Sequence, residues 1–282
     1  MNYDLNENKS VIAVLGAGCM ATAITRRIAA GKIILLGDIS EKNLEKTGND
    51  LRYSGYEVHT QVVDAMDRSS VQAFANKAES LGKVMYFIDT AGASPNQASP
   101  EHIVKLDLIA TAVAIDEFAK VIAKGGAGLI VSSQTGYMMD FTPEIEKLFA
   151  MTPTDELAEL DFVKNDAIAN PGIAYIAAKR CNQLRVRTAA ATTWGERGAR
   201  INTISPGIIV TPLAYDEFNA AGEGYQKMIE ASAAKRVGTA DEIAAAGAFL
   251  LGEYAGFITG TDLLIDGGVI AAMKSGKYSL GM

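Results

Sequence analysis

Short apolar runs rich in β-branched residues alternate with helix-like stretches along most of this 282-residue chain. Strands that are apolar at nearly every position are buried on both faces, and the helices between them form crossover connections. The sequence therefore predicts an α/β fold: one doubly wound parallel sheet of about seven strands with helices on both faces. Strands are expected at 11–15, 32–37, 57–63, 83–88, 128–132, 200–205 and 262–265, and helices at 21–30, 41–51, 71–81, 103–123, 173–194, 225–233 and 240–251.

Composition supports a single domain over 1–282 and argues against several kinds of partner. The chain has a formal net charge of −7 and no basic run, so neither a nucleic acid nor a membrane is expected to bind. Cys19 and Cys181 have neither disulfide nor metal spacing, and with only His59 and His102 as histidines no metal site is expected. The polar first ten residues do not form a signal peptide, so a cytoplasmic protein is expected.

The first expected strand runs directly into a turn, Gly16-Ala17-Gly18-Cys19-Met20-Ala21, that opens a helix. In this G-x-G-x-x-A pattern the glycines let the backbone approach a pyrophosphate at the helix N-terminus. Asp38 ends the second strand about 20 residues later, where a carboxylate binds ribose hydroxyls and repels a 2′-phosphate. Ile39 and Ser40 follow it rather than an arginine. The pattern predicts a Rossmann-like fold that prefers NAD(H) to NADP(H); a solvated loop acid is the alternative for Asp38.

Tyr175 and Lys179 lie four residues apart in an expected helix, so their side chains share one face. A lysine charge beside a tyrosine favours the phenolate and lowers the pKa of the phenol from about 10. A phenol adjusted in this way can exchange a proton with an alcohol or carbonyl oxygen. Because the same spacing also occurs on ordinary solvated helices, the pair gains meaning only from its surroundings.

Four further segments follow the expected strands in chain order. Asp64 follows the third strand, Thr90-Ala91-Gly92 the fourth, Ser133 the fifth, and the run 202–211 begins at the sixth. With the glycine turn and the Tyr175–Lys179 pair, this order resembles the short-chain dehydrogenase/reductase family over roughly residues 10–268. The resemblance implies a single NAD(P)-binding domain and an enzyme that transfers hydride.

The resemblance also implies a role for individual residues. Ser133 would bind the substrate oxygen, Tyr175 would be the general acid/base, and Lys179 would bind the nicotinamide ribose and lower the tyrosine pKa. The implied cofactor-binding residues are Gly16, Gly18, Cys19, Met20, Asp38, Asp64, Ala91, Gly92, Tyr175, Lys179, Pro206, Gly207, Ile209 and Thr211. A homo-oligomer, tetramer or dimer, would form through the helices 103–123 and 173–194.

The chain departs from the family pattern at the turn and at the fourth catalytic position. The glycine turn is shortened, with Met20-Ala21 in place of the family's Ile-Gly. Asp107 stands where the family has a catalytic asparagine. A carboxylate near Lys179 would partly neutralise the charge that favours the Tyr175 phenolate. We therefore hypothesise that Tyr175 titrates higher here than in relatives with asparagine; an ordinary acid at a helix start is the alternative.

The interval between Ser133 and Tyr175 is longer than the family's usual one. The extra segment, about 138–170, is predicted to form two short helices that start at Thr142-Pro143-Glu144 and at Thr152-Pro153-Thr154-Asp155. It is expected to be a lid or substrate wall, with an oligomer contact or surface decoration as the alternative. A second apolar-faced segment, 213–233, is expected to close over the substrate.

The sequence thus favours an NAD(H)-dependent dehydrogenase that interconverts a secondary alcohol and a ketone. A roomy apolar pocket fits a hydrophobic, steroid- or bile-acid-like substrate. One alternative is a 3-oxoacyl-type reductase, which Asp38 and the missing basic patch disfavour. The other is a dinucleotide-binding regulator without turnover, suggested by Asp107, Thr90 and the shortened turn.

Overall fold

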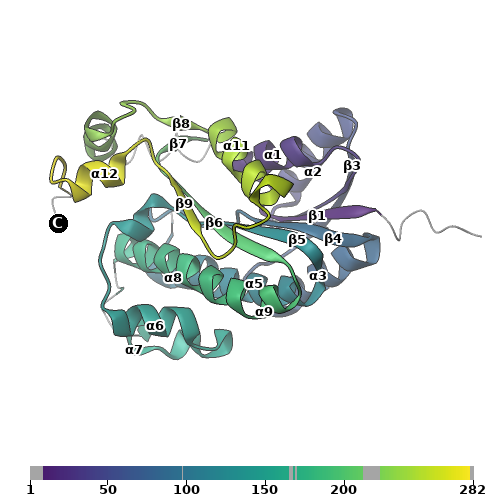
Figure 1. Ribbon diagram of the computed structural model, residues 1–282, viewed down its shortest axis with the longest axis horizontal. Coiled ribbons are helices and arrows are strands. Elements are labelled where there is room, and N and C mark those ends of the chain that lie inside the picture. The colour runs from purple at the N-terminus through teal and green to yellow at the C-terminus, as the bar shows by residue number, and fades with distance from the viewer. Residues whose placement is uncertain (1–8, 97, 165–167, 169, 212–222, 280–282) are drawn as a thin grey trace, which may run out of the picture.

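Seven parallel strands form one sheet in the order β3-β2-β1-β4-β5-β6-β9 (Figure 1). The computed structural model describes residues 9–96, 98–164, 168, 170–211 and 223–279. The strands are β1 (Ser10–Leu15), β2 (Ile33–Asp38), β3 (Glu57–Val62), β4 (Lys83–Asp89), β5 (Ile122–Val131), β6 (Arg200–Pro206) and β9 (Asp262–Ile265). A separate parallel pair joins β7 (Ile209–Val210) and β8 (Gly238–Thr239). The predicted fold class is confirmed, and all seven expected strands are present.

The strand order reverses between β1 and β4, which are neighbours although β2 and β3 lie between them in sequence. Alternate residues of β1 point to opposite faces, so Val11, Ala13 and Leu15 join one core cluster while Ile12 and Val14 join another. In doubly wound sheets, ligands bind beyond the carboxyl ends of the strands at such a reversal. This rule places the site at the ends of β1, β4 and β5.

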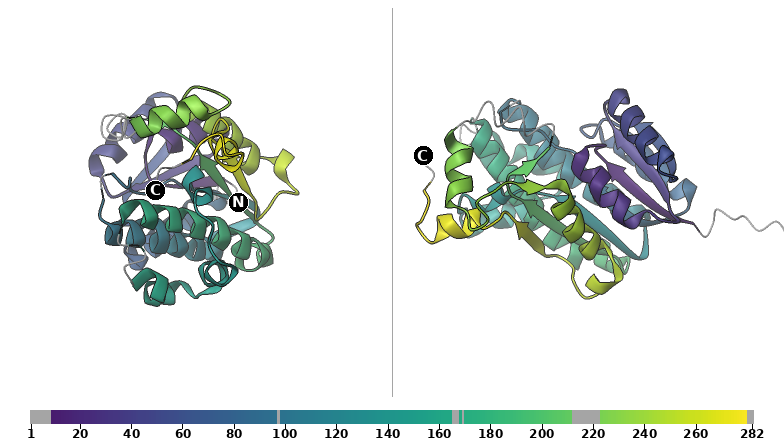
Figure 2. Two further views of the ribbon diagram at one scale, coloured as in Figure 1. Left: turned by 90° about the vertical axis from the view of Figure 1, so that its left-hand side faces the viewer. Right: turned by 90° about the horizontal axis from the view of Figure 1, so that it is seen from above.

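Helices cover both faces of the sheet (Figure 2). One face carries α1 (Cys19–Ile28), α2 (Glu41–Tyr53) and α11 (Ala240–Leu251); the other carries α3 (Arg68–Leu81), α5 (Thr111–Val121), α8 (Pro171–Ala191) and α9 (Thr193–Glu196) (Figure 1). A helix over 223–231, α12 (Val269–Lys274) and the 3₁₀ turns η2 (Gln134–Tyr137) and η5 (Glu253–Ala255) complete this part. No helix in the described ranges is long and apolar enough to span a membrane.

The helix expected over 103–123 differs in its middle. It consists of α4 (Pro100–Ile103), a π-helical stretch η1 (Val104–Ala110) and α5, and it ends at Val121, where β5 begins one residue later. The wider turns of a π-helix change which way successive side chains point, and such turns are frequent at functional sites. Asp107 lies in the centre of this stretch and is completely buried. The sequence pattern predicted the helix but contained no sign of the π turn.

The segment between Ser133 and Tyr175 forms an outer layer on the far side of α8 from the sheet. We call Pro143–Glu159 the outer layer; it contains α6 (Pro143–Met151) and the 3₁₀ helix η3 (Thr154–Glu159), and α7 (Asp161–Lys164) follows it. Thr142 caps α6 and Pro143 is its first residue, as predicted. Figure 1 shows α6 beyond α8 rather than above the strand ends. For these residues the structure favours a surface layer over a lid.

Two further expectations are affected by what the structure describes. The proposed closing segment 213–233 is described only from residue 223 onward, because 212–222 lie outside the described residues. Residues 223–231 are helical, as expected. The predicted homo-oligomer stays a prediction. The outer layer covers part of α8, one of the two helices through which the resemblance implies an interface.

Candidate active site

The glycine turn after β1 is built against the end of β4. Gly16 has a φ of +89°, and a Cβ there would lie 2.7 Å from Thr90 Oγ1 and 2.8 Å from the Ala91 nitrogen, so only glycine fits. Thr90 Oγ1 donates a hydrogen bond to the Gly16 carbonyl at 3.0 Å. Gly18 precedes α1, and none of the described side chains caps the first turn of this helix. The free N–H groups and the open space beside Gly18 suit a pyrophosphate.

Cys19 and Met20 occupy the shortened part of the turn. Cys19 is the first residue of α1 and is exposed, while Met20 is half-buried against the core beneath the turn. Ala21 is buried and packs the helix against the sheet. The small residue at position 21 therefore performs the packing role of the missing glycine.

Asp38 closes the other side of this turn. Its Oδ2 accepts the Ala17 N–H and its Oδ1 accepts the Ser40 N–H, each at 2.8 Å. The carboxylate is half-buried, and each oxygen retains a lone pair for another donor. The alternative of a purely solvated loop acid does not describe this residue, because Asp38 joins the turn after β1 to the start of α2. Asp64 lies in the loop after β3, where its Oδ1 accepts the Met66 N–H.

The proposed catalytic helix, α8, starts at the carboxyl edge of the sheet. Asn170 caps it by accepting the N–H groups of Gly172 and Ile173, and Pro171 is its first residue. The helix places Lys179 Nζ 5.1 Å from the centre of the Tyr175 ring, with Tyr175 half-exposed and Lys179 4% exposed. The predicted shared face is therefore present.

Ser133 is held beside α8 by its neighbour. Ser132 Oγ donates to the Lys179 carbonyl at 2.8 Å, which fixes the end of β5 against the catalytic helix. Ser133 is half-buried and caps η2, with its Oγ accepting the Thr135 N–H at 3.2 Å. This local bond leaves the hydroxyl hydrogen of Ser133 available for a substrate oxygen.

Asp107 pairs directly with Lys179. Its Oδ1 lies 2.8 Å from Lys179 Nζ, both side chains are almost completely buried, and Oδ2 accepts the Ala93 N–H at 3.0 Å. A Cβ at Gly92 would lie 2.6 Å from Asp107 Oδ1 and 3.4 Å from Lys179 Nζ. Gly92 thus provides the space in which the ion pair forms, a role that the sequence did not suggest. The expected proximity of Asp107 and Lys179 is present in the structure.

Sequence reasoning missed a second acid in the same place. Asp89, the last residue of β4, is 2% exposed and accepts the Ala91 N–H through Oδ1. Burial raises the pKa of Asp89 to about 7, although the Ala91 N–H and the charge of Lys179 both oppose this. An acid at the end of an otherwise apolar strand, in Ile88-Asp89-Thr90, was the signal available in the sequence.

These groups together determine the charge of Lys179. Burial alone would lower the pKa of Lys179, but the charges of Asp107, Tyr175 and Asp89 outweigh it and the pKa is raised. The ammonium therefore stays protonated at neutral pH. Asn182, also missed, donates its side-chain N–H to the Asp107 carbonyl at 3.0 Å and fixes the π turn against α8.

The segment expected beside the nicotinamide follows β6. Pro206 ends the strand, and the Gly207 N–H donates to the Ile265 carbonyl at 2.8 Å. A Cβ at Gly207 would lie 2.6 Å from the Asp266 Cα, so the glycine permits this close approach. Ile209 is buried in β7, and Thr211 follows that strand. Among the described residues, no group of three acidic, histidine or cysteine side chains is arranged to hold a metal ion.

The residues at this edge fit a nicotinamide dinucleotide. The uncapped N-terminus of α1 and the Gly16–Gly18 turn suit its pyrophosphate, and the Asp38 carboxylate suits a ribose diol. Ala91 lies beside the turn, because its N–H is one of the two groups that a side chain at Gly16 would strike. Tyr175 and Lys179 lie farther along the same edge of the sheet, after the reversal in strand order.

Comparisons with known proteins agree with this geometry. Residues 16–270 match a family described as enoyl-(acyl carrier protein) reductase. The short-chain dehydrogenase/reductase bsc3 of Alternaria brassicicola is 37% identical over 95% of this chain and 98% of its own. The 3-alpha-hydroxysteroid dehydrogenase/carbonyl reductase of Comamonas testosteroni is 27% identical over 95% of this chain and 100% of its own.

A solved structure extends the likeness to the fold. The short-chain dehydrogenase/reductase of Serratia marcescens superposes with a TM-score of 0.72 at 22% identity and covers 94% of this chain and 99% of its own. The family match and the 37% identical relative both span nearly the whole length. The chain therefore belongs to the short-chain dehydrogenase/reductase family, whose members are oxidoreductases that use a nicotinamide dinucleotide.

Proposed function

We propose that this enzyme interconverts a hydrophobic secondary alcohol and its ketone with NAD(H). The observation that carries the proposal is the buried ammonium of Lys179 beside the half-exposed Tyr175 ring, next to the Ser133 turn. A permanently charged lysine under an accessible phenol is the arrangement that proton exchange with an alcohol oxygen requires. The family match supports oxidoreductase chemistry in general but leaves cofactor and substrate to be argued from the residues.

In the proposed mechanism each side chain acts on the substrate oxygen or on the group beside it. Ser133 donates its hydroxyl hydrogen to that oxygen and orients it. Tyr175 accepts the alcohol proton in oxidation and returns it in reduction. Lys179 lies under the ring, and its positive charge stabilises the phenolate formed in the first half of this exchange. A bound nicotinamide supplies or accepts the hydride.

Preference for NAD(H) rests on Asp38. The carboxylate faces the glycine turn through the Ala17 N–H, and each oxygen keeps a lone pair for a ribose hydroxyl. A 2′-phosphate would meet this negative charge, and the next residues, Ile39 and Ser40, supply no cation. Asp38→Arg should therefore reverse the ratio of kcat/KM for NAD⁺ and NADP⁺.

The apolar surroundings of Tyr175 support a hydrophobic substrate. Tyr175 packs against the same apolar cluster as Ala93, Phe141, Phe162 and Val163, and Phe141, Phe149 and Phe162 contact one another edge to face. An apolar surface beside Tyr175 suits a steroid- or bile-acid-like alcohol better than a polyol.

The test is dinucleotide reduction with a panel of alcohols, followed by absorbance. The panel holds hydroxysteroids, bile acids, small secondary alcohols, polyols and 3-hydroxyacyl thioesters, each with NAD⁺ and NADP⁺. We expect turnover of a hydroxysteroid or bile acid with NAD⁺, and at least about 100-fold less in Tyr175→Phe. Preferred turnover of the acyl thioester would support the reductase alternative. NADH binding without turnover of any substrate would support the regulator.

A further inference from the structure

The outer layer follows the catalytic helix along its length. Its contacts with α8 progress in one direction: Glu146 pairs with Arg180, the Phe149 carbonyl accepts from Cys181, and Met151 accepts from Thr188. Phe149 is fully buried in this contact. The helix α6 therefore starts beside the half of α8 that carries Tyr175 and Lys179 and runs parallel to α8. It contacts α8 on the side that faces away from the sheet.

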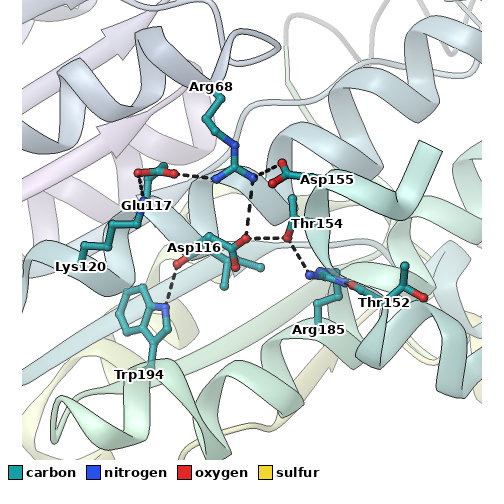
Figure 3. A network of polar contacts seen from close by, with 10 residues as sticks. Arg68, Asp116, Glu117, Lys120, Thr152, Thr154, Asp155, Arg185 and Trp194 are labelled. Carbon is teal, nitrogen blue, oxygen red and sulfur yellow. Dashed lines mark hydrogen bonds and ion pairs between the residues drawn. The ribbon is translucent and has the colours of Figure 1, made fainter. Parts of the chain in front are cut away.

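The far end of the outer layer is fixed by a polar network (Figure 3). Arg185 of α8 donates to the Thr152 carbonyl and to Thr154 Oγ1, both at 2.8 Å. Thr154 Oγ1 in turn donates to Asp116 Oδ2 of α5 at 2.5 Å. Arg68, at the start of α3, binds Asp155 and the 2%-exposed Glu117, as Figure 3 shows.

These contacts hold the layer to three helices at once. A lid would have to break the bonds of Arg185 and Thr154 and the Arg68–Asp155 ion pair each time it moved. The partly buried bonds of Arg185 and Thr154 would cost about 1–3 kcal/mol each if left unmade, whereas the exposed Arg68–Asp155 pair contributes little. The outer layer is therefore a fixed part of the fold.

From Arg180 a chain of hydrogen bonds continues inward under the active site. Arg180 donates to Gln183 Oε1 at 3.1 Å, and Gln183 Nε2 donates to Ser205 Oγ at 3.0 Å. Ser205 Oγ donates to Asp262 Oδ1 at 2.8 Å, and Tyr137 OH donates to Asp262 Oδ2 at 2.6 Å. Gln183 is 4% exposed and Ser205 is completely buried, so the centre of the chain is shielded from water.

Apart from Asp262 of β9, each link of this chain belongs to an element that carries or adjoins a proposed active-site residue. Arg180 directly follows Lys179, Ser205 directly precedes Pro206 and Gly207, and Tyr137 ends the turn that Ser133 begins. The turn η2 also packs closely against Gln183, the middle residue of this chain of hydrogen bonds, since a Cβ at Gly136 would lie 2.6 Å from Gln183 Nε2. The chain thus connects all three sides of the site below the level of the substrate.

We propose that the outer layer positions the catalytic groups through Glu146: this carboxylate fixes Arg180, and Arg180 fixes Gln183, which sets the Ser133 turn and the Pro206–Gly207 segment relative to Lys179. Glu146, Arg180 and Gln183 are positioning residues that do not touch the substrate. Because misplacement of reacting groups by 1 Å can cost about 100-fold in rate, a smaller displacement is expected to lower kcat roughly 5- to 20-fold. The proposal rests on the proposed dehydrogenase function for its kinetic test.

Glu146→Gln tests the proposal against a matched control, Glu159→Gln. Both glutamates belong to the outer layer and pair with a cation, but the partner of Glu159 is Lys164 of α7, whereas the partner of Glu146 is Arg180 of α8. We expect Glu146→Gln to lower kcat 5- to 20-fold with KM for the alcohol and Kd for NADH unchanged. Glu146→Asp should recover part of the loss, and Glu159→Gln should behave like the wild type.

Amide hydrogen exchange gives a readout that needs no turnover. In Glu146→Gln, exchange should accelerate in the turn 134–138, whereas in Glu159→Gln it should not. If the wild type turns over none of the alcohols, the proposed function fails while this measurement still decides the positioning role. A raised KM with unchanged kcat would show a substrate wall and overturn the proposal. Equal losses in both variants, or no change in kcat and exchange for Glu146→Gln, would also overturn it.

Discussion

Two carboxylates at the same edge of the sheet are stabilised in opposite ways. Asp38, beside the glycine turn, is half-buried and accepts two backbone N–H groups. Asp107, beside α8, is fully buried, and its Oδ1 faces the ammonium of Lys179. A half-exposed carboxylate held by nearby backbone N–H groups can be replaced at little cost in stability, whereas removal of either partner of a buried ion pair is strongly destabilising. Asp38 thus belongs to a site that neighbouring loops form, whereas Asp107 belongs to a site that elements distant in sequence form together.

The catalytic side is assembled from three such elements. Asp89 ends β4, Asp107 lies in the π turn and Lys179 lies in α8, and all three side chains are almost completely buried. Their charges depend on one another, and a change in one alters the others. We therefore expect substitutions at Asp89, Asp107 or Lys179 to change the free energy of unfolding strongly, and a substitution at Asp38 to change it little.

The largest effect is expected for Lys179→Met, which leaves Asp107 buried without its counter-charge. Breaking a buried ion pair in this way costs about 3–5 kcal/mol in the free energy of unfolding. Turnover should fall at least about 100-fold, because the phenolate of Tyr175 loses its positive neighbour. Urea unfolding and initial rates measure the two effects.

The double variant Lys179→Met/Asp107→Asn separates charge from packing. It removes both charges and keeps an oxygen for the Ala93 N–H, so it should regain at least half of the lost stability while remaining inactive. Equal destabilisation in the single and the double variant would show that the ion pair does not control stability here.

A smaller effect, of opposite sign, is expected for Asp89→Asn. Because the folded state holds the Asp89 proton up to about pH 7, while the unfolded chain releases it near pH 4, the wild type loses stability as pH rises between these values. The variant removes this loss and keeps an oxygen for the Ala91 N–H. At pH 8 it should be about 2–4 kcal/mol more stable than the wild type, at roughly 1.4 kcal/mol per pKa unit. At about pH 3, below both pKa values, the two should be nearly equal; a difference that does not vary with pH would contradict the assignment.

Asp107→Asn should alter the pH profile of alcohol oxidation. The Asp107 carboxylate offsets part of the Lys179 charge, so its removal leaves a stronger positive potential at Tyr175 and favours the phenolate, as long as Tyr175 and Asp89 keep Lys179 protonated. Because the buried Lys179 ammonium then lacks its main partner, the free energy of unfolding should also fall by about 3–5 kcal/mol. The apparent pKa of kcat/KM should fall by about one unit, equivalent to about 1.4 kcal/mol. The hypothesis is abandoned if the apparent pKa stays in place or rises.

The same contrast explains what could be predicted from the sequence. The Gly16–Gly18 turn and the Tyr175–Lys179 pair are local patterns, in which backbone periodicity alone fixes the neighbours, and both have the predicted geometry. The strands were predicted because buried parallel strands are apolar throughout. Asp89 was missed although it stands out as an acid at the end of an apolar strand, because the charges that act on it, those of Lys179 and Asp107, come from elements that meet only in the folded chain.

The position of the outer layer could not be predicted for a similar reason. The helix start at Thr142-Pro143 was readable from capping preferences, but its direction depends on Arg180, Arg185 and Arg68 in other helices. A segment that leaves the carboxyl edge was expected to cover the site. Long-range ion pairs hold its described part along α8 instead.

Asp38→Asn should give the smallest change in stability of the four single variants. The amide keeps one oxygen for either the Ala17 or the Ser40 N–H but turns an NH₂ group toward the other, so one backbone bond is lost at a half-exposed position. We expect a loss of about 1 kcal/mol in the free energy of unfolding. Dissociation constants from NADH and NADPH fluorescence should rise about tenfold for NADH and change little for NADPH, while kcat at saturating NAD⁺ stays close to wild type. A loss of stability as large as that of Lys179→Met would mean that Asp38 is as dependent on its partners as Asp107, and the distinction between the two carboxylates would fail.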